Sequence, residues 1–236
     1  WHFTSYDNPL LDKEEIDAAK KSMSAFSFRQ EFMASFEAAG GELFKEEHIQ
    51  FSEEEPDGGQ FYIAVDLAGF AEVQTATTKT NRLDQTSIAV VKAGTEGWWV
   101  ADIIHGRWGV EKTARKIFEA VRDYQPVAVG IEKGALKNAV LPYLTDLMNS
   151  GQRFFRVEEL THGNKKKTDR IVWALQGRFE HGQIALSEGE WNTEFLDQLF
   201  QFPNPLVHDD LVDALAYIDQ LAKVSYYAHF EEDDVE

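Results

Sequence analysis

Phe61-Tyr62-Ile63-Ala64-Val65-Asp66-Leu67-Ala68-Gly69 is the stretch that decides the fold. Its short apolar run reads as a buried β-strand, and Asp66 stands at the carboxyl end of that strand. Ser87 to Lys92 and Trp98 to Ile104 are two further expected strands, joined by a turn at Gly94–Gly97. These three strands predict an antiparallel meander.

Helices and strands alternate after the meander. Helical periodicity runs from Val110 to Tyr124, and Pro126 ends it. Another apolar strand, Val127 to Ile131, again ends in an acid, Glu132. The remaining expected elements are a helix at Asn138–Asn149, a strand at Phe154–Val157, a helix after the basic loop at 162–170, a short strand at Ile184–Leu186, and helices at 191–200 and 210–224. This order predicts an α/β fold whose mixed sheet is flanked by helices on both faces.

The first 58 residues differ from the rest of the chain in composition and in the pattern of apolar residues. They read as helices at Lys13–Met23 and Ser27–Ala39, followed by a charged, turn-rich linker at Glu53–Gly59. We therefore expect a helical N-terminal segment at 1–58, a main domain at 59–228 and an acidic tail at 229–236. The chain begins Trp1-His2-Phe3 without methionine, as expected for a piece excised from a longer protein.

Composition limits the classes of function. The absence of cysteine excludes disulfides and thiolate metal sites, and no apolar run approaches the roughly 20 residues needed to span a bilayer. The net charge of −18 argues against a nucleic-acid partner, because phosphate binding relies on lysine and arginine. However, 14 of those 18 charges lie in residues 1–60 and 231–236, and residues 133–185 hold 9 bases against 5 acids. The centre of the chain is therefore compatible with DNA.

A third group of acids lies near the C-terminus, in His208-Asp209-Asp210-Leu211-Val212-Asp213. The pattern turns helical after Asp210, so Asp209, Asp210 and Asp213 share one side of a first helical turn. Aspartate is also a favoured N-cap, so capping and metal binding explain this group equally well when it is taken alone.

The two strand-tip acids favour metal binding. The functional sites of such sheets lie beyond the carboxyl ends of the strands, and an unpaired charge there carries a cost of several kcal/mol. Together with the C-terminal aspartates, Asp66 and Glu132 offer the oxygen ligands that Mg²⁺ or Mn²⁺ prefers. Two such ions about 3.5–4 Å apart support hydrolysis of phosphodiester bonds. The structural alternatives are that Asp66 forms a turn, that Glu132 pairs with Lys133 or Lys137, and that His208 caps or packs.

These three motifs resemble the nuclease domain of the large terminase subunit of tailed bacteriophages, which belongs to the RNase H-like (retroviral integrase) superfamily. The motifs are Ile63–Gly69, Gly130-Ile131-Glu132 and His208–Leu215, in that order along the chain. Lys165–Ile171 with Phe179–Ile184 also resembles this family. The segments Asp7-Asn8-Pro9-Leu10 and Phe28–Phe36 resemble the end of a terminase ATPase domain. One departure is the long polar loop at Phe70–Leu83.

The resemblance implies a metal-dependent endonuclease that cuts concatemeric double-stranded viral DNA in the host cytoplasm during virus assembly. By position, the family's catalytic acids fall on Asp66, Glu132 and the 208–213 cluster, with Asp210 as first choice and Asp209 and Asp213 next. Two Mg²⁺ or Mn²⁺ ions are expected, with Asp66 bridging both. Lys165, Lys166, Lys167 and Arg170 would hold the DNA backbone, while His208 and Asp84 are accessory candidates. The implied partners are the ATPase domain of the same polypeptide, the portal and the small terminase subunit.

Two other readings stay open at this point. One is another RNase H-like enzyme, such as a Holliday-junction resolvase or a transposase core. The other is a non-catalytic nucleic-acid or motor interaction module whose acids serve as caps. A Walker A phosphate-binding loop is absent from the sequence, so ATP hydrolysis is not expected of this chain. Strong sequence specificity is not expected either, because no element has a basic, groove-reading composition.

Overall fold

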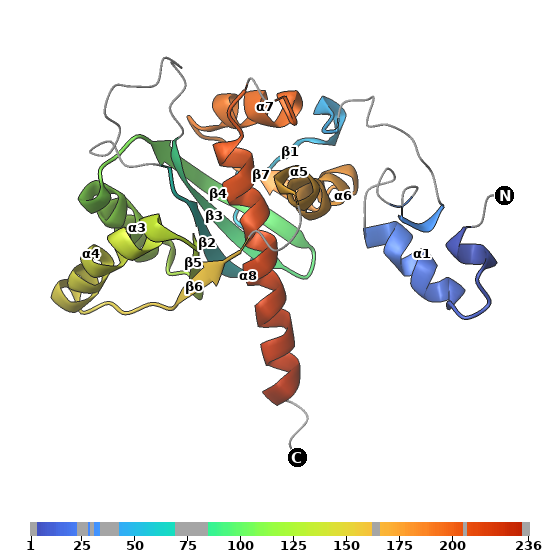
Figure 1. The fold of residues 1–236 in the computed structure, drawn as a ribbon, viewed down its shortest axis with the longest axis horizontal. Helices are drawn as coiled ribbons and strands as arrows, with labels where there is room; N and C mark the ends of the chain where they lie inside the picture. Colours follow the sequence, from blue (N-terminus) through green and yellow to red (C-terminus); the bar gives the residue numbers. More distant parts are fainter. Residues whose placement is uncertain are drawn as a thin grey trace.

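A seven-stranded mixed sheet forms the centre of the protein (Figure 1). The computed structural model describes residues 4–22, 28, 31–33, 43–68, 85–161, 166–204 and 207–232. Within them the strands are β1 (Gln50–Phe51), β2 (Gln60–Asp66), β3 (Thr86–Gly94), β4 (Gly97–Gly106), β5 (Ala128–Glu132), β6 (Val157–Leu160) and β7 (Ile184–Leu186). Their order across the sheet is β1-β7-β4-β3-β2-β5-β6.

The antiparallel meander expected from the sequence is confirmed. β3 pairs antiparallel with both β2 and β4, whereas β5 and β6 add parallel strands beside β2, and β7 and β1 add parallel strands beside β4. The β3–β4 turn needs glycine at position 97, where φ is +144° and a Cβ would lie 2.4 Å from the Gln183 carbonyl oxygen. The expected mixed α/β sheet is therefore the observed one.

Helices cover both faces of this sheet. The longer ones are α1 (Lys13–Ser22), α3 (Val110–Tyr124), α4 (Ala135–Gly151), α7 (Asn192–Gln201) and α8 (Asp210–Glu232). Between β6 and β7 lie α5 (Lys167–Ile171), a π-helical turn (Val172–Gln176) and α6 (Gly177–Glu180); the chain also has short 3₁₀ helices at Ser5–Asp7 and Glu46–His48. None of the helices in the described residues combines the length and apolar character that a membrane crossing requires.

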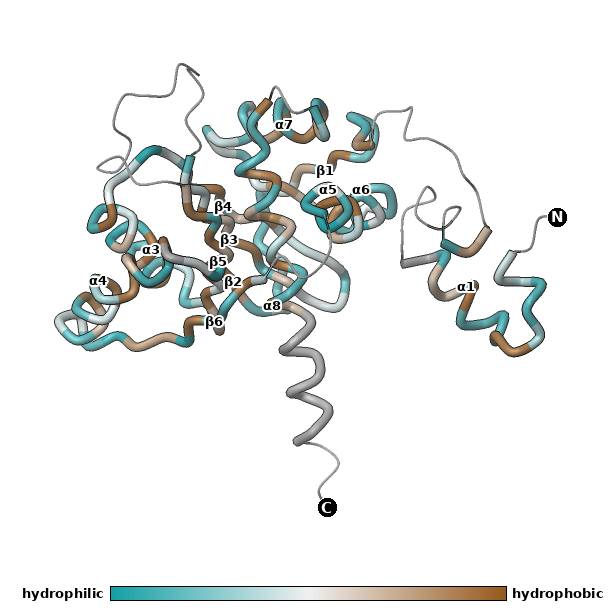
Figure 2. Tube along the Cα trace, viewed as in Figure 1, coloured by the Kyte–Doolittle hydropathy of each residue, from teal (hydrophilic) through white to brown (hydrophobic). Residues whose placement is uncertain are grey.

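The alternation of side chains along β2 separates two hydrophobic cores. Tyr62 and Ala64 belong to the core under α8, with α5 to α7, whereas Ile63 and Val65 belong to the core under α3 and α4. Figure 2 shows the apolar residues concentrated in the strands between these layers. Because side chains alternate with a period of two, Asp66 lies on the α8 face of the sheet.

Some elements differ from the sequence prediction. The strand expected at Phe154–Val157 is β6 at Val157–Leu160, because pairing with β5 begins at Val157 opposite Val129. Phe154 is 68% exposed instead. The strand β1 is not among the elements that the sequence predicts: it lies before the boundary expected at residue 59, yet it pairs with β7.

Other expectations fall partly outside the described residues. Of the expected Ser27–Ala39 helix, Phe28 is buried and stacks on Phe32, with ring centroids 5.1 Å apart. The Phe70–Leu83 loop and residues 233–236 of the acidic tail lie outside the described part of the chain.

Candidate active site

Asp66 and Glu132 lie side by side at the carboxyl ends of β2 and β5. Val65 pairs with Ile131 in these parallel strands, so the two acids are the next residues on adjacent strands. They share a side-chain hydrogen bond. Burial, the charge of Asp213 and the contact with Glu132 together raise the pKa of Asp66 well above its ordinary value. Asp66 therefore holds a proton more tightly than an exposed aspartate does.

Asp213 brings a third carboxyl to this pair from the first turn of α8. It is 2% exposed, and its Oδ1 accepts a short hydrogen bond from the Arg170 guanidinium. Arg170 in turn lies over the Tyr217 ring, 4.0 Å from its centroid. Burial raises the pKa of Tyr217, which stays a neutral phenol. This arrangement fixes Asp213 on the side of α8 that faces Asp66.

Lys167 places a positive charge inside the acidic cluster. Its Nζ lies 2.7 Å from Asp209 Oδ1 and 3.0 Å from Asp213 Oδ2. Burial alone would lower the pKa of Lys167, but Asp213, Asp209 and Asp66 outweigh burial and raise it. Lys167 thus neutralises part of the negative charge of these carboxylates, which would otherwise repel one another.

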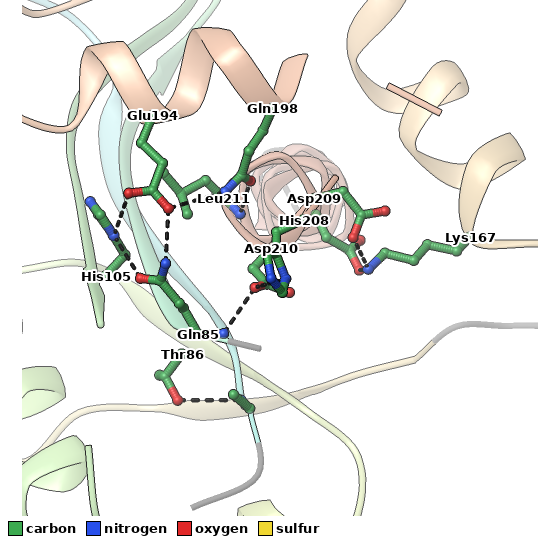
Figure 3. A network of polar contacts seen from close by, with 12 residues as sticks. Gln85, Thr86, His105, Lys167, Glu194, Gln198, His208, Asp209, Asp210 and Leu211 are labelled. Atoms are coloured by element: carbon green, nitrogen blue, oxygen red, sulfur yellow. Dashed lines mark hydrogen bonds and ion pairs between the residues drawn. The ribbon is translucent and has the colours of Figure 1, made fainter. Parts of the chain in front are cut away.

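Asp210 takes part in a separate network shown in Figure 3. Its Oδ2 accepts a hydrogen bond of 2.9 Å from the Gln85 backbone N–H and lies 3.6 Å from His208 Nδ1. The Gln85 side chain donates to Glu194 on α7 at 2.9 Å, and its amide oxygen lies 3.1 Å from His105 Nδ1. The start of α8 is thereby tied to β3, β4 and α7.

Gln198 of α7 completes the support of α8. Its side-chain oxygen accepts a hydrogen bond of 2.9 Å from the Leu211 backbone N–H, one of the donors that the first turn of a helix leaves without an intrahelical partner. Gln198 is buried, so this contact is shielded from water.

The structure brings together most of the residues singled out from the sequence. Asp66 interacts with Glu132, Asp213 and Lys167, Asp209 joins them through Lys167, and Asp210 and His208 lie in the adjoining network. Lys133 and Lys137 both contact Glu159, at 3.8 and 2.8 Å. Lys166 is exposed, and Asp84 and Lys165 lie outside the described residues.

Sequence reasoning missed the residues that support the acids. These are Gln85, His105, Glu194 and Gln198. His105 could have been found by extending the predicted hairpin register to the level of Asp66. Gln85, Glu194 and Gln198 carry no signal in the sequence, because only the packing of α7 against α8 brings them to the site.

The donor set suits a hard divalent cation. Carboxylate oxygens are the preferred ligands of Mg²⁺ and Mn²⁺, and burial, with the neighbouring acids Asp213 and Glu132, raises the pKa of Asp66. As placed, however, the described side chains do not form a ready group of three acidic or histidine ligands around one point. Asp213 is engaged by Arg170 and Lys167, and Asp66 by Glu132. A metal ion bound here would compete with these contacts for the carboxylate oxygens.

Comparisons with known proteins agree with this architecture. The large terminase of a thermophilic bacteriophage superposes with a TM-score of 0.65 at 11% identity, covering 92% of this chain and 54% of that chain. The human cytomegalovirus terminase nuclease domain, Mn soaked and inhibitor bound, superposes with a TM-score of 0.55 at 16% identity, covering 76% and 94%. At these identities the likeness concerns the fold. The chain spans about half the length of the phage protein.

No relative is found among curated protein sequences. The family model described as the terminase RNaseH-like domain, in contrast, matches residues 63–219. The match begins in β2, three residues before Asp66, and ends in α8 after Asp213, so it encloses both strand-tip acids and the helix aspartates. This chain therefore belongs to the terminase RNase H-like domain family.

Proposed function

We propose that this domain is a metal-dependent endodeoxyribonuclease that cuts concatemeric double-stranded DNA as part of a viral terminase large subunit. The observation that carries the proposal is the convergence of Asp66, Glu132 and Asp213 on the α8 face of the sheet. Capping does not account for this convergence, because two of the three acids stand on strand tips. The Mn-soaked cytomegalovirus domain of the same fold supports the choice of metal.

Each acid has a distinct place in this proposal. Asp66 interacts with both Glu132 and Asp213 and would be the ligand shared by two Mg²⁺ or Mn²⁺ ions. Glu132 and Asp213 would each serve as a further ligand, and Asp210 remains a candidate at the adjoining position. Ions held there would supply an activated water and stabilise the leaving 3′ oxygen.

Lys167 and Arg170 have a more specific role than the sequence indicated. Arg170 is committed to Asp213, so it holds a ligand in place and does not reach out to DNA. Lys167 occupies the position of a cation between Asp209 and Asp213. With a metal ion at Asp213, Lys167 would be free to contact a DNA phosphate, as would Lys166, which is exposed, and Lys165, which lies outside the described residues.

The wider setting follows from the family. The similar phage large terminase is about twice as long as this chain, so we propose that an ATPase domain belongs to the same polypeptide. We further propose that the portal and the small terminase subunit are its partners in the packaging motor, in the cytoplasm of the host during virus assembly.

Plasmid nicking tests the proposal. We expect Mn²⁺-dependent conversion of supercoiled DNA to the nicked form, abolished by EDTA. Asp66→Asn, Glu132→Gln and Asp213→Asn should each lower the rate by more than about 100-fold, since even residues outside the first coordination shell contribute about 10–100-fold. Asp146→Asn, on the exposed side of α4, is the matched control and should cut normally. Full activity of a folded Asp66→Asn variant would overturn the assignment.

A further inference from the structure

Ser87 lies next to Asp66 in a row of side chains that crosses the sheet. Asp66 is paired with Ser87, and Ser87 with His105, in the antiparallel ladders of β2, β3 and β4. Residues directly opposite in such ladders point to the same face, with Cβ atoms about 4.5–5.5 Å apart. Ala89 and Ile103, each two residues along from Ser87 and His105, belong to the core under α8. Ser87 therefore faces the acidic cluster.

The hydroxyl of Ser87 is fully buried, at 0% exposure, and has no hydrogen-bond partner among the described residues. Buried polar groups are satisfied in most native proteins, so an orphaned hydroxyl requires an explanation. Its neighbours in the row offer one acceptor that is not fully used. His105 Nδ1 is already engaged with Gln85 (Figure 3). The Asp66 carboxyl group, in contrast, has two oxygens and shares one hydrogen bond with Glu132.

We propose that Ser87 is a positioning residue for the metal ligand Asp66. The inference rests on the proposed function, because it gives the Ser87 hydroxyl a role only if Asp66 holds metal. Ser87 is the neighbour of Asp66 on β3, and its hydroxyl would donate a hydrogen bond to the Asp66 carboxylate. Carboxylates that bind metal are usually held by such an outer contact, which fixes their orientation.

A rival explanation is that Ser87 is a packing residue whose hydroxyl has no role. Thr113 on α3 offers the comparison, because its hydroxyl is likewise fully buried and has no partner among the described residues. Thr113 belongs to the helix that packs on the opposite face of the sheet. Removal of either hydroxyl changes packing equally little, but only removal of the Ser87 hydroxyl should affect the acids.

The test is the affinity for Mn²⁺, measured on the whole chain by the electron paramagnetic resonance signal of the free ion. We expect Ser87→Ala to raise the Kd for Mn²⁺ about 10–100-fold, the range typical of outer contacts to metal ligands. The thermal midpoint of the metal-free variant should be unchanged or higher, because an unsatisfied group is removed. Thr113→Val should leave the Kd unchanged. Ser87→Cys, which keeps a weaker donor, should give an intermediate Kd and decides the question if the alanine variant does not fold.

The outcomes separate this inference from the proposed function. If the wild type binds Mn²⁺, Asp66→Asn does not, and Ser87→Ala binds within twofold of the wild type, Ser87 is a packing residue and the inference is wrong while the proposed function stands. If the wild type does not bind Mn²⁺, or Asp66→Asn binds it equally well, the proposed function fails and the inference fails with it.

Discussion

At the scale of single residues, the main feature is a negatively charged cluster that the protein neutralises from within. Asp66 and Glu132 share a hydrogen bond, and Asp213 and Asp209 contact Lys167. Both contacts lower the electrostatic repulsion between these carboxylates, one through a hydrogen bond between two acids and the other through the ammonium group of Lys167.

This arrangement predicts how stability depends on pH. Because the pKa of Asp66 is raised in the folded protein, folding is favoured at low pH, and this contribution is lost as pH rises above the ordinary aspartate value of 3.8 through the raised pKa. Each unit by which the pKa in the folded protein exceeds that in the unfolded chain corresponds to about 1.4 kcal/mol in the free energy of unfolding. Asp66→Asn cannot ionise, so in EDTA it should gain free energy of unfolding relative to the wild type as pH rises from 4.5 to 8.

Urea denaturation of both proteins at several pH values measures this difference. Asp146→Asn serves as the control, because it makes the same chemical change at an exposed position of α4. A constant difference between Asp66→Asn and the wild type would show that Asp66 titrates as an ordinary aspartate.

At the scale of elements, α7 holds the first turn of α8 in place. The Leu211 N–H donates to Gln198, and the Gln85 side chain joins Glu194 to the strand edge. Gln198→Met leaves a buried N–H without its acceptor, and we expect a loss of about 1–3 kcal/mol in the free energy of unfolding. Gln201→Met is the matched control on the same helix, because Gln201 is exposed and its side chain donates to Asp197, one turn away. Equal urea midpoints for the two variants would contradict the role of Gln198.

Strands and helices differ in how well the sequence predicts them. The predicted bounds of α3 are correct, because its apolar period is regular and Pro126 follows it. Phe154 and Phe155 give a misleading strand signal, since apolar residues favour strands whether or not a partner is available. Phe155 instead packs near Phe118 of α3, with ring centroids 6.4 Å apart. The π-helical turn at Val172–Gln176 has no sequence signal that periodicity can detect.

The acids of the candidate site also differ in how well the sequence predicts their roles. Asp66 and Glu132 are predictable because a strand tip is a local property, visible as an apolar run followed by an acid. The roles of the helix aspartates are not predictable, because Asp209, Asp210 and Asp213 differ only in which partner the tertiary fold brings to each. Sequence spacing places them on one side of a helix, and only the structure separates the contacts of Asp210 with Gln85 from those of Asp213 with Arg170.

At the scale of the whole molecule, the segment that precedes the family match is attached to the sheet. Lys92 of β3 is buried and donates to Glu55 and to the Pro56 carbonyl oxygen, both at 2.6 Å. Trp99 of β4 donates to the Ser52 carbonyl oxygen at 2.9 Å. The sequence predicts a linker at the acidic stretch Glu53–Asp57, and these contacts hold that stretch against the strands.

Loss of the Lys92 contacts should release this stretch. In Lys92→Met we expect faster cleavage after Glu53–Glu55 by a glutamate-specific protease, because cleavage requires the backbone to open locally. Lys112→Met, an exposed position on α3, should be cut at the wild-type rate. Mass spectrometry of a digestion time course identifies the site, and unchanged cleavage in Lys92→Met would show that these contacts do not restrain the segment.

The alternation of faces along β2 has a consequence for how this domain can change in length. One residue inserted between Gln60 and Val65 would turn Asp66 toward α3 and α4 and bring an apolar neighbour to the acids, whereas two inserted residues would restore the original face. A single insertion in β2 would therefore need a β-bulge, like the one in the β3–β4 ladder at Val90–Val91, to keep Asp66 on the α8 face. Segments outside the sheet carry no such constraint, so differences in length among relatives should accumulate there.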